Sequence, residues 1–151
     1  SPINKEKVFN AFRLVYIGGG RDAAAVLKSQ VVESDKSLEN IRSSMNLIDS
    51  GVDALLRGDV AELGLLLNEA WSYKQRFGPS VSSKKIDNIY QRGMAAGALG
   101  GKLLGAGGGG YFLFVVPEEV ADRFDQGMCD YVVSRISLDE VGARLTYYDE
   151  A

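Results

Sequence analysis

The stretch from residue 100 to residue 116 constrains the fold of this chain more than any other. Seven of its first eleven residues are glycine, and the apolar run Tyr-Phe-Leu-Phe-Val-Val follows them directly. Glycine loses more conformational freedom on folding than any other residue, so a plain turn does not need so many. An apolar run of this length is typical of a buried strand. The sequence therefore predicts a glycine-rich loop over residues 100–110 and a central strand over residues 111–116.

Two interpretations of this loop remain open. Backbone with few side chains lets successive N–H groups converge on an anion, whereas the alternative is a structural link between a helix and a strand. Residues 105–110 spell G-x-G-x-x-G, but the dinucleotide fingerprint needs a strand before the loop and a helix after it, and here that order is reversed. No Gly-Lys-Ser/Thr closes the run, which excludes a Walker A loop. We favour the phosphate-binding interpretation, with these candidate residues: Gly105, Ala106, Gly107, Gly108 and Gly109.

Periodicity and capping residues predict the elements before the loop. Residues 12–17 form a β-branched and aromatic strand that ends at the glycines of residues 18–20, and Asp22 can cap a helix that begins at Ala23. Asp35 or Ser37 can start a long helix whose apolar residues recur at steps of three and four. That stripe comprises Leu38, Ile41, Met45, Ile48, Val52 and Leu55.

Three further segments complete the set of expected elements. Asp59, with Glu62 three residues on, predicts a capped helix, and Ser82 or Ser83 predicts another that runs to about Leu99. On that second helix, Gly93 and Gly97 share a face that would let another backbone come close. After the central strand we expect a short helix from Pro117, then strands over residues 132–138 and 143–148 joined by a tight turn.

This order of elements predicts an α+β fold with a ferredoxin-like, small antiparallel sheet of four strands covered by helices. The length of 151 residues suits one domain spanning residues 1–151. The chain does not begin with Met, so we expect a processed form, a tagged form or a piece of a longer protein.

Composition narrows the function classes. The net charge of −3 argues against a nucleic-acid partner, and no apolar run approaches the ~20 residues of a membrane helix, so we expect no membrane association. The chain has no histidine, which excludes histidine catalysis and histidine metal ligation within it, and we predict no metal ligands. The single cysteine, Cys129, cannot form an internal disulfide and fits a reducing, cytoplasmic location.

The glycine stretch also carries a family resemblance. The string GALGGKLLGAGGGGYFLFVVP resembles the third conserved motif of the GHMP kinases, and ELGLLLNEAWSYKQRF and SSKKIDNIYQRG extend the resemblance upstream. The longer pattern looks like the sugar-kinase branch, which includes galactokinase and the D-glycero-D-manno-heptose 7-phosphate kinases. It covers roughly residues 12–148. Asn68 departs from the family pattern, because relatives often carry histidine there.

The resemblance implies that this chain is the C-terminal domain of such a kinase. The ATP-binding loop and the catalytic acid of the family belong to an N-terminal domain, whose motifs do not occur here. The implied partners are that N-terminal domain and a sugar or sugar-phosphate substrate. ATP and Mg²⁺ are the implied cofactors of the full-length enzyme, with none bound firmly by this chain and no catalytic residue within it.

Three more residues are candidates for substrate or phosphate binding. Trp71 and Lys74 lie three positions apart on a predicted helix, and the resemblance places them beside the sugar pocket. The alternative is a core tryptophan with a lysine that reaches solvent. Arg21, after the first glycine cluster and near a helix start, suits a phosphate, or else it is a solvated surface residue.

Two functions from different classes therefore remain. The first is the C-terminal part of an ATP-dependent small-molecule kinase, inactive on its own. The second is a non-catalytic, ferredoxin-like module that binds a small ligand, since one fold hosts many functions. For the kinase we also expect an exposed apolar surface beside the glycine loop, made for the N-terminal domain and able to cause self-association.

Overall fold

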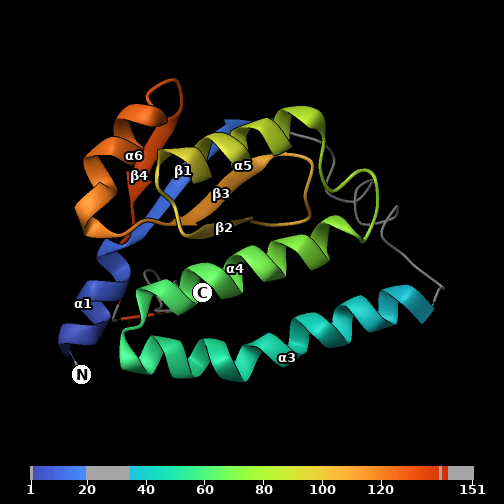
Figure 1. Ribbon diagram of the computed structural model, residues 1–151, viewed down its shortest axis with the longest axis horizontal. Coiled ribbons are helices and arrows are strands. Elements are labelled where there is room, and N and C mark those ends of the chain that lie inside the picture. Colours follow the sequence, from blue (N-terminus) through green and yellow to red (C-terminus); the bar gives the residue numbers. More distant parts are fainter. Residues whose placement is uncertain (1, 20–34, 140, 143–151) are drawn as a thin grey trace, which may run out of the picture.

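A computed structural model describes residues 2–19, 35–139, 141 and 142 of the chain. In this part the strands pair in the order β2-β3-β1-β4, and all neighbours are antiparallel. Together with the chain order β1, helices, β2, β3, helix, β4, this is the ferredoxin-like α+β topology that the sequence predicts. Figure 1 shows α5 and α6 against the sheet, and α4 between β2 and α3.

The bounds of the elements follow the predicted order. The helices are α1 (Pro2–Asn10), α3 (Asp35–Arg57), α4 (Val60–Gln75), α5 (Lys84–Ala96) and α6 (Ala121–Gly127), with a 3-10 turn, η1 (Glu118–Val120), before the last. The strands are β1 (Phe12–Gly18), β2 (Gly100–Leu103), β3 (Gly110–Val115) and β4 (Val132–Arg135). The helix expected from Ala23 and the strand expected over residues 143–148 lie outside the described residues.

The central strand is confirmed. β3 lies between β1 and β2, and Phe112 and Phe114 are fully buried against α5 and α6. Their rings join a cluster with Tyr90 of α5 and Phe124 of α6, at centroid separations between 5.3 and 5.9 Å. This cluster belongs to the main core of the domain. It holds β3, and therefore the end of the glycine loop, in place.

Helix starts agree with the predicted caps. Asp59 Oδ1 accepts a hydrogen bond from the Glu62 N–H at 3.0 Å, and Ser83 Oγ accepts one from the Ile86 N–H at 3.3 Å. Only half of the predicted capping box forms, because the Glu62 carboxylate pairs with Arg57 instead of reaching back to the cap. These caps satisfy amide groups that have no partner inside the helix.

Three expectations are wrong in detail. α5 ends at Ala96 and not near Leu99, because Gly97 takes a left-handed φ of 118° and closes the helix. Residues 100–103, predicted as loop, form β2, since the strand pairs with β3 from Gly100 opposite Val115 to Leu103 opposite Phe112. β4 ends at Arg135, three residues before the predicted end.

The glycines of α5 and β2 allow close packing, but the close contact between two backbones lies at a different glycine from the ones predicted. Gly93 was expected to admit another backbone, but a Cβ there would lie 2.6 Å from the Phe114 ring. Gly97 is the helix cap, and a Cβ there would lie 3.1 Å from the Val120 side chain and not against another backbone. The close backbone approach occurs elsewhere: a Cβ on Gly100 would lie 1.8 Å from the Gly64 carbonyl oxygen, so α4 and β2 touch through two glycines.

Candidate functional site

The glycine loop between β2 and β3 has a backbone that only glycine adopts easily. Five of its glycines have positive φ, between 68° and 156°, namely Gly105, Gly107, Gly108, Gly109 and Gly110. Two strands hold its ends, because Leu103 lies opposite Phe112 in the hairpin. This loop is anchored at both ends, and between Gly105 and Gly110 its only side chain is that of Ala106.

Two contacts hold the middle of the loop. The Gly108 N–H donates to the Val81 carbonyl at 3.0 Å, so this amide anchors the loop and is committed within the protein. A Cβ on Gly107 would lie 3.0 Å from the Val81 backbone. The segment before α5 therefore supports the loop from one side.

The two glycine clusters that stand out in the sequence meet in space. A Cβ on Gly109 would lie 2.9 Å from the Gly18 carbonyl oxygen, and one on Gly19 would lie 3.5 Å from the Gly108 carbonyl oxygen. Gly18 is also where the β1–β3 register shifts by one residue. The end of β1 and the glycine loop therefore form one continuous backbone surface.

Two adjoining hollows open on this surface. The first, of 260 Å³, is lined by Gly19, Leu104, Gly105, Ala106, Gly107, Gly109, Gly110 and Tyr111. The second, of 220 Å³, is lined by Ile17, Gly18, Gly19, Ser83, Lys85, Ile86, Ile89, Gly108 and Gly109. They share Gly19 and Gly109, so a ligand with two separated polar groups could reach both.

The second hollow has features that suit an anion. Ser83 caps α5 beside the glycine backbone, and the exposed Lys85 lies on its wall. The N-terminal end of a helix attracts negative charge through its aligned peptide dipoles. Our sequence reasoning missed Ser83 and Lys85 as site residues, although the Ser-Ser-Lys-Lys run just before a helix was the available signal.

Lys74 reaches the loop from α4. Its Nζ donates to the Leu103 carbonyl at 2.8 Å and to the Gly105 carbonyl at 2.5 Å, and so ties the helix to the start of the loop. Burial, together with the nearby charge of Lys102, lowers the pKa of Lys74 to about 8. The ammonium group is thus still mostly charged at neutral pH, and it lies at the edge of the candidate site.

The other two candidates are placed differently. Trp71 is 1% exposed and packs against Tyr90 and Phe112 in the core, which matches the core alternative for this residue. Its indole Nε1 is buried without a hydrogen-bond partner. Arg21 lies outside the described residues. Asn68, the departure from the family pattern, accepts a hydrogen bond from the Tyr90 hydroxyl and so links α4 to α5.

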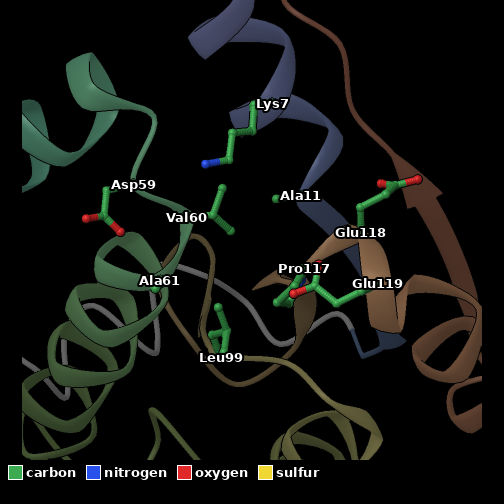
Figure 2. A pocket seen from close by; sticks show the side chains of 9 residues that line it. All are labelled: Lys7, Ala11, Asp59, Val60, Ala61, Leu99, Pro117, Glu118 and Glu119. Carbon is green, nitrogen blue, oxygen red and sulfur yellow. The ribbon is translucent and has the colours of Figure 1, made fainter.

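A separate cavity of 300 Å³ lies at the opposite end of the sheet, beyond the last residue of β3 (Figure 2). Lys7 of α1 points into it, Asp59 lies on one side and Glu118 and Glu119 on the other. Since β3 runs from the glycine loop at Gly110 to this end at Val115, the two sites are separated by the length of the strand.

Comparison with known proteins agrees with this geometry. Residues 52–133, more than half of the chain, match the family described as GHMP kinases C terminal. The chain therefore belongs to the GHMP kinases. The match includes α4, α5, β2, the glycine loop and β3, which build the candidate site together with Gly18 and Gly19 at the end of β1.

Curated relatives within the GHMP kinases differ in the substrate they are named for. The chain is 32% identical over 70% of its length to the bifunctional fucokinase/GDP-fucose pyrophosphorylase of Arabidopsis thaliana, covering 10% of that protein. It is 33% identical over 54% of its length to the D-glycero-alpha-D-manno-heptose 7-phosphate kinase of Campylobacter jejuni, covering 24% of it. It is 30% identical over 70% of its length to the mevalonate kinase of Thermococcus gammatolerans, covering 33%. The chain thus spans a third or less of these relatives.

Solved GHMP kinase structures share the fold. The Methanococcus jannaschii mevalonate kinase aligns over 87% of this chain and 40% of its own, with a TM-score of 0.68 at 24% identity. The Lactococcus lactis galactokinase complexed with galactose aligns over 82% of this chain and 43% of its own, with a TM-score of 0.61 at 15% identity. The predicted fold class and family are confirmed, whereas sugar kinases and mevalonate kinases resemble this chain to a similar degree.

No helix in the described part of the chain is long and apolar enough to cross a membrane. The described residues also contain no group of three or more His, Cys, Asp or Glu side chains that could hold a metal ion.

Proposed function

We propose that this chain is the C-terminal part of an ATP-dependent kinase that phosphorylates a small molecule, and that its glycine loop lies against phosphate groups. One observation carries the proposal: five glycines with positive φ form an anchored backbone surface beside a capped helix start and two lysines. Rigid backbone donors and fixed positive charge are what phosphoryl transfer requires, because charge spreads over the moving phosphoryl group.

The residues of this chain have separate roles in the proposal. Gly105, Ala106, Gly107 and Gly109 provide close backbone approach, while Gly108 anchors the loop through Val81. Lys74 holds the loop and adds positive charge at its edge. Trp71 supports the site by packing beneath Phe112, and Arg21 remains a proposed phosphate ligand.

The rest of the active site belongs to an N-terminal domain in this proposal. ATP and Mg²⁺ supply the phosphoryl donor and neutralise its charge, with Mg²⁺ held by the nucleotide and that domain. The exposed aromatic and apolar side chains beside the loop, Tyr16, Leu104 and Tyr111, suit contact with it. Their exposure supports the proposal of an apolar surface made for that domain beside the glycine loop.

We propose a sugar or sugar phosphate as the substrate, with mevalonate as the second candidate because mevalonate kinases match equally well. All of these are polyhydroxylated or anionic, and all offer a hydroxyl group as phosphoryl acceptor. ADP-release assays of the full-length protein with sugars, sugar phosphates and mevalonate distinguish them by kcat/KM. The 151-residue chain alone should show no turnover, and robust turnover by it would contradict the proposed division of the site.

A mutation at the loop tests its role. Replacing Gly107 or Gly108 with valine in the full-length protein should lower kcat/KM at least about 100-fold, or roughly 2.7 kcal/mol of transition-state stabilisation. Thermal unfolding of each variant separates this effect from misfolding. Variants that melt like the unmodified protein and keep its kcat/KM would show that the loop is only a turn, and would favour a non-catalytic binding module.

A further inference from the structure

The outer face of α3 carries a row of large apolar side chains that the domain does not cover. These six residues, here called the α3 seam, are each between 45% and 60% exposed: Leu38, Ile41, Met45, Ile48, Val52 and Leu55. A surface helix normally turns such a stripe toward the core. Contiguous exposed apolar side chains of this kind mark an interaction site.

The opposite face of α3 is the one that packs on the domain, and its side chains are mostly small. Ala54 is fully buried, Ser43 interacts with the Tyr73 hydroxyl of α4, and Gly51 and Leu47 are partly buried on the same side. Contacts between α3 and α4 are therefore close, and the large apolar residues are left pointing outward. The sequence places its strongest hydrophobic stripe where only a second molecule or another segment can cover it.

The spacing of the seam indicates what kind of element covers it. Its residues follow one another at steps of three, four, three, four and three. This is a repeat of 3.5 residues, which keeps a narrow seam facing a partner helix in a coiled coil. The seam spans about 26 Å at 1.5 Å per residue, and α3 is already held as a helix by α4.

We propose that the partner is a second copy of this chain, whose α3 packs antiparallel against the first. The seam is self-complementary in that orientation. A two-fold axis between Met45 and Ile48 places Met45 opposite Ile48, Ile41 opposite Val52 and Leu38 opposite Leu55. Every layer then joins two apolar side chains, as an isologous dimer interface requires.

Charges beside the seam agree with the same arrangement. Arg42 and Asp49 each follow a seam residue, Ile41 and Ile48, so both flank the seam on the same side. The two-fold axis brings Arg42 of one copy near Asp49 of the other, and the reverse, which gives two symmetric ion pairs. If a mutation reversed the charge of either residue, like charges would face each other there.

The position of the seam separates it from the proposed kinase interface. α4 lies between α3 and the sheet (Figure 1), so the seam faces away from the sheet that carries the glycine loop, which the N-terminal domain must reach. Four of the six seam residues also precede residue 52, where the match to the family begins. The seam is therefore available to a second copy of the chain while the glycine loop faces the N-terminal domain.

Sedimentation velocity of the 151-residue chain over about 1–200 μM tests the dimer. We expect a reversible dimer, and Ile48→Glu should weaken it at least about tenfold by placing two charges at the two-fold axis. Leu65→Glu is the matched control, since Leu65 is an exposed leucine of α4 outside the seam. Circular dichroism should show that both variants fold, because neither side chain is buried. A chain that stays monomeric, or a dimer that tolerates Ile48→Glu, would overturn the proposal.

Cysteine cross-linking tests the orientation, with Cys129→Ser as the background. Chains carrying Leu38→Cys should cross-link to chains carrying Leu55→Cys, and neither should cross-link to itself, because the two copies of each residue lie about 26 Å apart when the helices are antiparallel. Self-linking of each variant would indicate parallel helices and overturn the antiparallel arrangement. If a longer form with the N-terminal domain is monomeric and protects Met45→Cys from thiol labelling, that domain covers the seam and the proposal is wrong.

Discussion

The two halves of the glycine-rich stretch use the same residue for different physical reasons. In β2, Gly100 and Gly101 have ordinary backbone angles, but an added Cβ would lie 1.8 Å from the Gly64 carbonyl and 2.7 Å from the Phe114 ring. In the loop, Gly105 and Gly110 have positive φ, and an added Cβ would meet nothing within 4 Å. Gly100 and Gly101 are needed because neighbours approach closely, whereas Gly105 and Gly110 are needed because the backbone turns. Only the second half leaves room for a ligand.

The largest expected effect is at the packed half. Gly100→Ala should lower the free energy of unfolding by about 3 kcal/mol or more, because the new methyl group overlaps the α4 backbone. Gly105→Ala should cost about 1 kcal/mol, since it strains φ without a clash. Chemical denaturation of both variants gives the two values. Equal losses would contradict the distinction between the two halves.

A smaller effect is expected where Lys74 joins the halves. Lys74→Met removes hydrogen bonds to the Leu103 and Gly105 carbonyls, and should lower the free energy of unfolding by about 1–2 kcal/mol. Lys85→Met is the control, because Lys85 is exposed and its loss should change stability by less than about 0.5 kcal/mol. Hydrogen exchange should also become faster in the loop of Lys74→Met. Unchanged exchange would mean that Lys74 does not hold the loop.

The smallest effect concerns pH. The pKa of Lys74 is about 8 in the folded chain, below the ordinary lysine value of 10.5, so between these values the unfolded chain binds more protons. Stability from this residue should therefore rise with pH from about 8 to 10.5, reduced by solvent screening because Lys74 is partly exposed. Denaturation midpoints across this range, in the unmodified chain and in Lys74→Met, measure the difference. A slope that persists in Lys74→Met would assign the pH dependence to other groups.

Much of the fold could be predicted from local patterns. Residues 111–116 are continuously apolar, and Asp59 and Ser83 stand at helix starts, so the central strand and two helices were confirmed near their expected bounds. β2 could not be found this way, because Gly-Gly-Lys-Leu has low strand propensity and forms a strand only through pairing with β3. Tertiary pairing there overrides local preference.

The candidate site was predictable in part, for a similar reason. The glycine loop stands out by composition, but its contact with Gly18 and Gly19 joins residues about ninety positions apart and has no local signal. Trp71 and Lys74 do lie on one helix, three positions apart, as the sequence predicted. Their spacing could not tell that Trp71 packs in the core while Lys74 extends to the loop carbonyls. That outcome depends on where β2 lies.

The contact between Gly64 and Gly100 has a consequence for how this protein can change over generations. Every single-base change in a glycine codon that alters the residue adds a Cβ, and at Gly100 that atom has no space. Neither a neutral step nor a compensating one at Gly64 is available, since Gly64 is already the smallest residue. Single substitutions at these two glycines therefore cannot change the distance between α4 and β2 in small steps. New specificities in such a lineage should arise from open positions such as Gly105, where the genetic code offers side chains that the structure can accept at modest cost.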